Sequence, residues 1–146
     1  MNRVVSYMGK TLAKNPGKAF FDRQMIENMK VTQCEVQGKT CKILVDLPIL
    51  PEWTNSGGTL HGGAISTLID QATTIAISGL DDRYTVSVDL NVSFIGAVKE
   101  GNLQIEAVCH KVGKSLAFTS ASISSNDILV ATGKHTKFMM AHKWNE

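Results

Sequence analysis

The sequence predicts an α+β fold in which an antiparallel sheet of about six strands wraps around one long helix. The helix is indicated by residues 62–79, where apolar side chains recur every three or four positions. The sheet is indicated by residues 84–94, where apolar and polar side chains alternate as in a strand with one buried face. Because so apolar a helix must be covered, we expect the strands to form a second layer around it.

Residues 1–19 form a basic segment ahead of the main fold. Four basic residues and no acidic residue precede Asp22. This composition is similar to that of a mitochondrial transit segment and predicts a mitochondrial protein. The helical spacing of Val4, Met8 and Leu12 equally predicts an ordinary basic helix, with the cytoplasm as the location of the protein. The pattern leaves both interpretations open.

The main domain is expected over residues 20–140, followed by a tail at 141–146. A first hairpin turns at Gly38-Lys39 and ends before two prolines, and a last hairpin turns at Asn126-Asp127. The expected strands cover residues 29–36, 40–47, 84–94, 103–109, 117–124 and 128–138.

A glycine-rich loop runs from Asn55 into the long helix and ends in His61-Gly62-Gly63. Glycines let a ligand approach the main chain closely. The unpaired amides of a first helical turn attract negative charge, including the charge that develops on a reacting carbonyl oxygen. The loop is neither a P-loop nor a dinucleotide fingerprint. We therefore expect an anion-stabilising helix start beside a histidine.

One acidic residue, Asp70, lies within the helix and away from its main apolar stripe. Gly62 and Asp70 are eight residues apart, which is about 12 Å along a helix axis, so one carbonyl group cannot easily contact both. Two helices that pack antiparallel about a two-fold axis would bring Gly62 of one chain to Asp70 of the other. The sequence therefore predicts a homodimer, alone or within a dimer of dimers, with shared sites.

The chain resembles the small acyl-CoA thioesterases of the hotdog fold, in particular the thioesterase superfamily member and phenylacetate-type branch. The resemblance spans roughly residues 20–138. It is carried by Asn55, His61-Gly62-Gly63, Asp70, Val86-Ser87-Val88-Asp89-Leu90-Asn91, and two segments that begin at Gly113 and Gly133. The resemblance implies the hotdog fold, hydrolysis of acyl-CoA to a free acid and coenzyme A in lipid metabolism, and no metal or other cofactor.

The resemblance also implies the catalytic residues. The Gly62 amide would polarise the thioester carbonyl, His61 would orient the site, and Asn55 would contact substrate or water. Asp70 would act as general base or nucleophile, and Ser87 would hold the attacking water. Without the resemblance, the same residues are a turn-forming Asn55, a helix-capping His61, a solvated Asp70 and a Ser87 on the polar face of its strand. A Ser87–His61–Asp70 triad is disfavoured, since Ser87 lacks the Gly-x-Ser-x-Gly context.

Coenzyme A contacts are expected in two segments, of which the first forms a turn with two ammonium groups suited to phosphates. The residues concerned are Lys111, Gly113, Lys114 and Ser115 in that turn, and Phe94 and Lys99 in the stretch that ends the alternating strand. A solvated turn is the alternative for the first segment. Lys134 and Phe138 stand where the family members have arginine and histidine. We expect these departures to affect coenzyme affinity and acyl preference.

Composition excludes several other classes. A formal charge of +2 without a basic stripe argues against a nucleic-acid binder. Three cysteines without metal-ligand spacing predict neither a zinc site nor a disulfide framework. No apolar run reaches the roughly 20 residues of a membrane span. The alternative functions are a non-catalytic hotdog scaffold in a larger, mitochondrial assembly and a hotdog dehydratase, whose usual Asp/His pattern is not seen.

Overall fold

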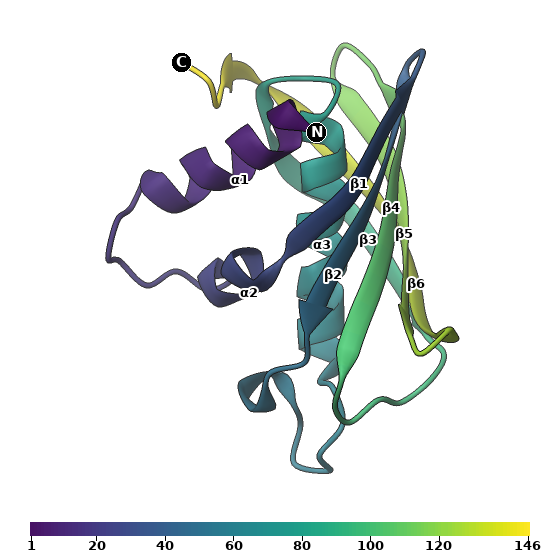
Figure 1. Ribbon diagram of the computed structural model, residues 1–146. Coiled ribbons are helices and arrows are strands. Elements are labelled where there is room, and N and C mark those ends of the chain that lie inside the picture. Colours follow the sequence, from purple (N-terminus) through teal and green to yellow (C-terminus); the bar gives the residue numbers. More distant parts are fainter.

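Six strands form one antiparallel sheet that curves around the long helix α3 in the computed structural model, which describes residues 1–146 (Figure 1). The helices are α1 (Asn2–Ala13), α2 (Arg23–Asn28), α3 (Gly62–Ser78) and the single 3-10 turn η1 (Pro51–Trp53). The strands are β1 (Lys30–Gln37), β2 (Thr40–Pro48), β3 (Arg83–Phe94), β4 (Asn102–Val112), β5 (Leu116–Ser125) and β6 (Ile128–Lys143). The predicted fold class is confirmed, with boundaries that differ mainly at the strand ends.

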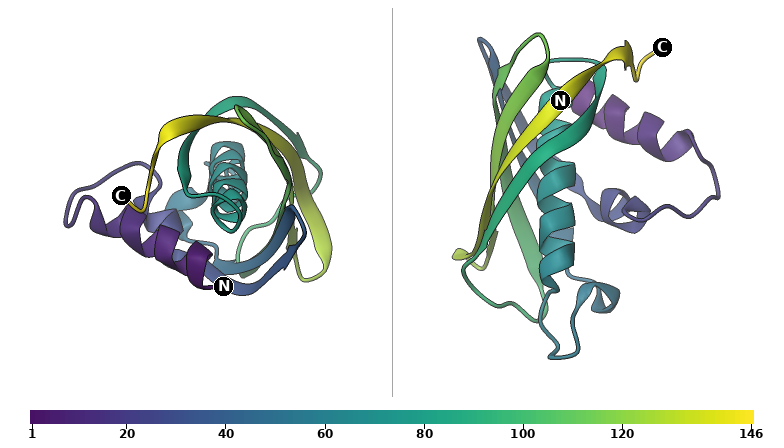
Figure 2. Two further views of the ribbon diagram at one scale, coloured as in Figure 1. Left: turned by 90° about the horizontal axis from the view of Figure 1, so that it is seen from above. Right: turned by 180° about the vertical axis from the view of Figure 1, so that it is seen from behind.

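The strand order is β1-β2-β4-β5-β6-β3, so β1 and β3 are the two edges of the sheet. Seen from above, the sheet encloses α3 on one side, while α1 and α2 lie across the open side (Figure 2). The concave face of the sheet therefore holds the core, and the edge of β3 remains unpaired in the single chain.

The core forms between α3 and the inward side chains of the sheet. Leu68, Ile69 and Ala72 of α3 have no exposed surface, and they belong to one apolar cluster with Ile43 and Ile105 from the sheet. Burying a side chain of this size stabilises a fold by about 1.5–3 kcal/mol. This packing holds α3 in place and leaves Asp70, on a different face, available to β6.

The predicted alternation of β3 is partly wrong, because a bulge between Ser87 and Asp89 changes which residues face α3. Val86 and Val88 were expected on the buried face, but their exposed fractions are 50% and 58%. Ser87 was expected on the polar outer face, but its hydroxyl bonds to a buried histidine of β6. After the bulge the prediction holds for Leu90, which packs against the core.

Helix α1 docks on the C-terminal half of α3. Val4 is completely buried, and the Arg3 guanidinium donates a hydrogen bond to the Ser78 carbonyl at 3.2 Å. The ring of Tyr7 meets Trp144 edge to face, with ring centroids 5.5 Å apart. Residues 2–13 therefore form a helix that packs on the core of its own chain.

Candidate active site

The loop before α3 presents the start of the helix to solvent. The His61 ring caps the helix, since Nδ1 accepts the Gly63 N–H at 2.8 Å. The Gly62 amide, first in the helix, has no acceptor within the helix. The ring of Phe94 covers the same glycine so closely that a Cβ atom at Gly62 would lie 3.3 Å from Phe94 Cε1. The Gly62 N–H is thus placed where a carbonyl oxygen could reach it, with an aromatic wall alongside.

Asn55 organises the loop rather than projecting from it. Its Oδ1 accepts the backbone N–H groups of Gly57 and Thr59, and its Nδ2 donates to Thr59 Oγ1 at 2.9 Å. Within one chain this is the turn-forming arrangement that the residue type allows without any substrate.

Two hollows open on either side of the helix start. One, of about 400 Å³, has walls from α2, η1 and α3 that include Met25, Trp53 and His61. The other, of about 380 Å³, has walls that include Gly62 and Phe94. A molecule with two arms that diverge from a carbonyl group would find an apolar surface for each arm.

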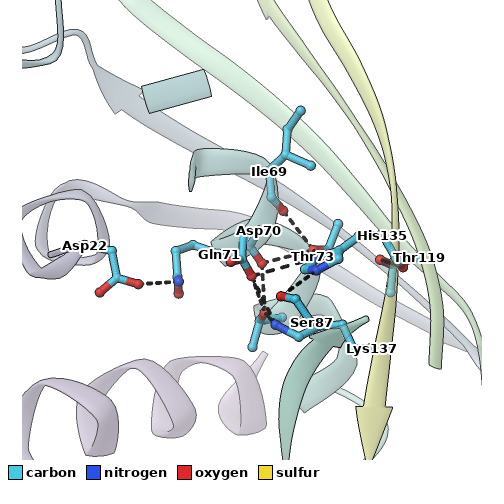
Figure 3. Close-up of polar contacts among 10 residues, drawn as sticks. Asp22, Ile69, Asp70, Gln71, Thr73, Ser87, Thr119, His135 and Lys137 are labelled. Atoms are coloured by element: carbon cyan, nitrogen blue, oxygen red, sulfur yellow. Dashed lines mark hydrogen bonds and ion pairs between the residues drawn. The ribbon is translucent and has the colours of Figure 1, made fainter. Parts of the chain in front are cut away.

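Asp70 lies two turns further along α3, where its carboxylate meets β6 (Figure 3). Its Oδ1 is 3.0 Å from the Lys137 ammonium, which also donates to Thr74 Oγ1 at 2.6 Å. The side chain of Asp70 is 32% exposed, whereas that of Lys137 is only 5% exposed. All polar partners of the carboxylate are on Oδ1, so Oδ2 is free to contact a ligand.

A second set of contacts joins Ser87 to the same region through His135 (Figure 3). His135 is buried, and burial followed by the nearby Lys137 ammonium lowers its pKa to about 4, so the ring is neutral at pH 7. Thr73 Oγ1 donates to the Ile69 carbonyl and therefore accepts from His135 Nδ1, 2.8 Å away. With the ring proton assigned to Nδ1, Nε2 accepts the Ser87 hydroxyl at 2.9 Å. The lone pairs of Ser87 Oγ remain available to a water molecule.

His135 and Lys137 were not among the residues expected in the site from the sequence. Both lie on the inward face of β6, in the same alternating row as Gly133 and Met139. The alternation of β6 predicts that both positions face the core. A histidine and a lysine are unusual there, and this is the signal that could have revealed them.

The residues expected to bind coenzyme A do not come together within one chain. Lys111 and Lys114 are exposed, and the turn at Gly113 is held by Arg83, whose guanidinium donates to the carbonyls of Gly113 and Lys114. Arg83 begins β3 and Phe94 ends it, so at about 3.3 Å per residue the two segments stand roughly 35 Å apart. Exposed Lys99 follows Phe94, and Ser115, also exposed, belongs to the turn.

No group of three or more His, Cys, Asp or Glu side chains is arranged to hold a metal ion. None of the helices combines the length and the apolar character that crossing a membrane requires.

The model of the thioesterase superfamily matches residues 57–132 of this chain. Human acyl-coenzyme A thioesterase 13 is 37% identical over 102 residues, which cover 67% of this chain and 73% of the human protein. The crystal structure of zebrafish thioesterase superfamily member 2 superposes with a TM-score of 0.73 at 30% identity, covering 93% of this chain and 96% of that one. A phenylacetic acid degradation-related protein from Ralstonia eutropha has a TM-score of 0.73 at 19% identity, over 91% and 99% of the two chains, and shares the fold.

Proposed function

The chain belongs to the thioesterase superfamily and hydrolyses acyl-CoA to a free acid and coenzyme A, and we propose that Asp70 activates the attacking water in this reaction. The observation that carries the assignment is the Asp70 carboxylate, which is held through Oδ1 while Oδ2 is free. A carboxylate in this arrangement can accept a proton without losing its orientation.

In the proposed reaction Oδ2 takes a proton from water as the water oxygen attacks the thioester carbon. The charge that develops on the carbonyl oxygen is stabilised by the Gly62 N–H and by the positive end of the α3 dipole. The C–S bond then breaks, and the proton held by Asp70 passes to the coenzyme A thiolate. Direct attack of Oδ2 on the carbonyl, followed by hydrolysis of the anhydride, is the alternative route for the same oxygen.

Ser87 is assigned to the water. Its own proton is donated to neutral His135, so its oxygen can accept a hydrogen bond from the attacking water molecule. His61 and Asn55 are assigned to the substrate side of the site, where His61 Nε2 is free because Nδ1 caps the helix.

Each site is proposed to be shared within a homodimer, which can pair further into a dimer of dimers. Gly62 and Asp70 of one chain are about 12 Å apart along α3, so a single thioester cannot contact both. The unpaired edge of β3, with exposed Val86 and Val88 nearby, supports association of two copies at this edge. A shared site also allows the lysine turn at Gly113 and the stretch from Phe94 to Lys99 to come from different chains around one coenzyme A.

Two finer assignments belong to the proposal: the branch of the family and the location of the protein in the cell. Membership of the phenylacetate-type branch is supported by the fold of the Ralstonia relative and by the sequence segments described above. A role in mitochondrial lipid metabolism, with the cytoplasm as the alternative location, stays a prediction from the composition of residues 1–19.

Asp70→Asn tests the proposal by steady-state release of the coenzyme A thiol from a panel of short, long and aromatic acyl-CoA substrates. We expect kcat to fall by roughly 100-fold or more, the usual contribution of a general base, with the fold retained by circular dichroism. Asp82→Asn is the matched control, because Asp82 forms a surface ion pair with Lys143 at 3.5 Å. Turnover by folded Asp70→Asn equal to that of the control would refute the assignment, and a wild-type protein without turnover on any substrate would favour the scaffold alternative.

A further inference from the structure

Lys137 is the most deeply buried lysine of the molecule that takes part in an ion pair. It points inward from β6, where its neighbours along the inward face of the strand include His135 and Met139. Removing an ammonium group from water is unfavourable unless it is paired and hydrogen-bonded, and burial lowers the pKa of Lys137 while Asp70 opposes this change. A purely structural position of this kind is more readily filled by an apolar residue.

The contacts of Lys137 all converge on Asp70. The ammonium lies 3.0 Å from Asp70 Oδ1 and donates to Thr74 Oγ1, which in turn donates to the Asp70 backbone carbonyl at 2.8 Å. Lys137, which anchors the Asp70 carboxylate, is thus itself held by Thr74, one turn after Asp70 on α3. One oxygen of the carboxylate is occupied by this anchor, and the other is not.

Several other ionisable groups surround this pair. Asp22 at the start of α2, whose Oδ2 accepts from Gln71, and Tyr7 of α1 approach from the open side of the sheet, and His135 lies beside Lys137 on β6. The charge of Asp89 on β3 raises the pKa of His135, and Tyr84 raises the pKa of Tyr7. Of these groups Lys137 is the one cation at pH 7 that contacts Asp70, since burial keeps His135 neutral.

We infer that Lys137 is the positioning residue of the reaction: it holds the Asp70 carboxylate through Oδ1, turned so that Oδ2 faces the attacking water. This inference rests on the proposed role of Asp70 and extends it to a residue that touches no part of the substrate. Lys137 acts on kcat through Asp70 and leaves substrate binding, and therefore KM, largely unchanged.

The test uses Lys137→Met, which keeps most of the length of the unbranched side chain and removes the charge. We expect kcat to fall about 10- to 100-fold, a part of the roughly 100-fold or greater effect of a general base. KM should stay close to the wild-type value, because Lys137 touches no part of the substrate. Lys143→Met is the control, since Lys143 lies on the same strand and pairs with Asp82 at the surface.

The double variant Asp70→Asn/Lys137→Met separates positioning from structural support. It leaves neither charge without its partner, so it should fold even if one single variant does not. If Lys137 acts through Asp70, the double variant is no slower than Asp70→Asn alone. A Lys137→Met protein with the kcat of the control, or a double variant slower than Asp70→Asn by the full factor of Lys137→Met, overturns the inference. Loss of activity in Lys137→Met with full activity in Asp70→Asn would instead overturn the proposed role of Asp70.

Discussion

His135 is a histidine that its surroundings keep neutral. Its ring nitrogens contact Thr73 and Ser87, both hydroxyl partners, and the nearest cation is Lys137. The folded protein therefore binds a proton on this ring only near pH 4, whereas the unfolded chain binds one near pH 6.5. Protonation in this range therefore favours the unfolded chain.

We predict that stability decreases as the pH falls from about 6.5 toward 4. The folded-state pKa is lowered, so the unfolded state binds more protons in this window and the free energy of unfolding falls by a few kcal/mol from this one residue. Urea unfolding at pH 7.5 and pH 5 measures the change. His135→Asn, which keeps polar atoms but cannot take up a proton there, should lose less stability over the same interval. An equal loss in the two proteins would show that another group causes it.

Asp70 and Ser87 could be singled out from the sequence, whereas the residues that contact them could not. The contacts of these two residues lie 67 and 48 positions away, on a strand whose register follows from pairing with β3 and β5. A hydrophobic pattern predicts which face of a strand is buried, but not which buried position lies opposite a given turn of a helix. His135 and Lys137 became recognisable only when that register was known.

At the scale of elements, α3 and β6 pack closely against each other at Gly133. A Cβ atom on Gly133 would lie 2.9 Å from Ile69 Cγ2 and 3.3 Å from the Asn91 carbonyl oxygen. Both neighbours are held by packing or by the strand ladder, so neither can move aside easily. The glycine thus sets the distance between the helix that carries Asp70 and the strand that carries Lys137.

Gly133→Ala is predicted to lower the free energy of unfolding by about 1–3 kcal/mol, because the added methyl group overpacks the interface. Turnover should fall as well, since α3 and β6 move apart at the site. Chemical denaturation and the acyl-CoA assay measure the two effects. Gly9→Ala is the control, because a Cβ atom on Gly9 of α1 would meet nothing within 4 Å. A Gly133→Ala protein as stable as this control would contradict the packing argument.

For the molecule as a whole, the two groups needed for one reaction, an N–H donor and a carboxylate, lie too far apart in a single chain to contact the same carbonyl group. The Gly62 amide lies at one end of α3, and the Asp70 carboxylate lies two turns away, beside β6. The spacing along the helix predicted this separation from the sequence, and the observed helix from Gly62 to Ser78 preserves it. The phase change in β3 could not be predicted, since a bulge depends on how two strands pair.

Mixing two inactive chains should restore activity. A dimer of one Asp70→Asn chain and one His61→Ala chain contains one intact site and one doubly disabled site, so random exchange should recover about a quarter of wild-type turnover. Native mass spectrometry measures the mixed dimer, and the acyl-CoA assay measures the recovery. Mixed dimers that stay as inactive as either parent would show that Asp70 acts within its own chain, provided that His61→Ala alone is inactive.

The bulge in β3 works like a shift of reading frame within one strand. Thr85 and Ser87 are turned toward the helix on one side of it, and Leu90 and Val92 on the other, so a single strand serves both the polar site and the apolar core. Removing Val88 would barely alter the composition of the chain. It would nevertheless remove the bulge and leave Ser87 and Leu90 two positions apart on the same face, whereas a strand with the present number of residues and no bulge would turn one of the two to solvent. The chemistry of this protein therefore depends on the count of residues along β3 as much as on their identity.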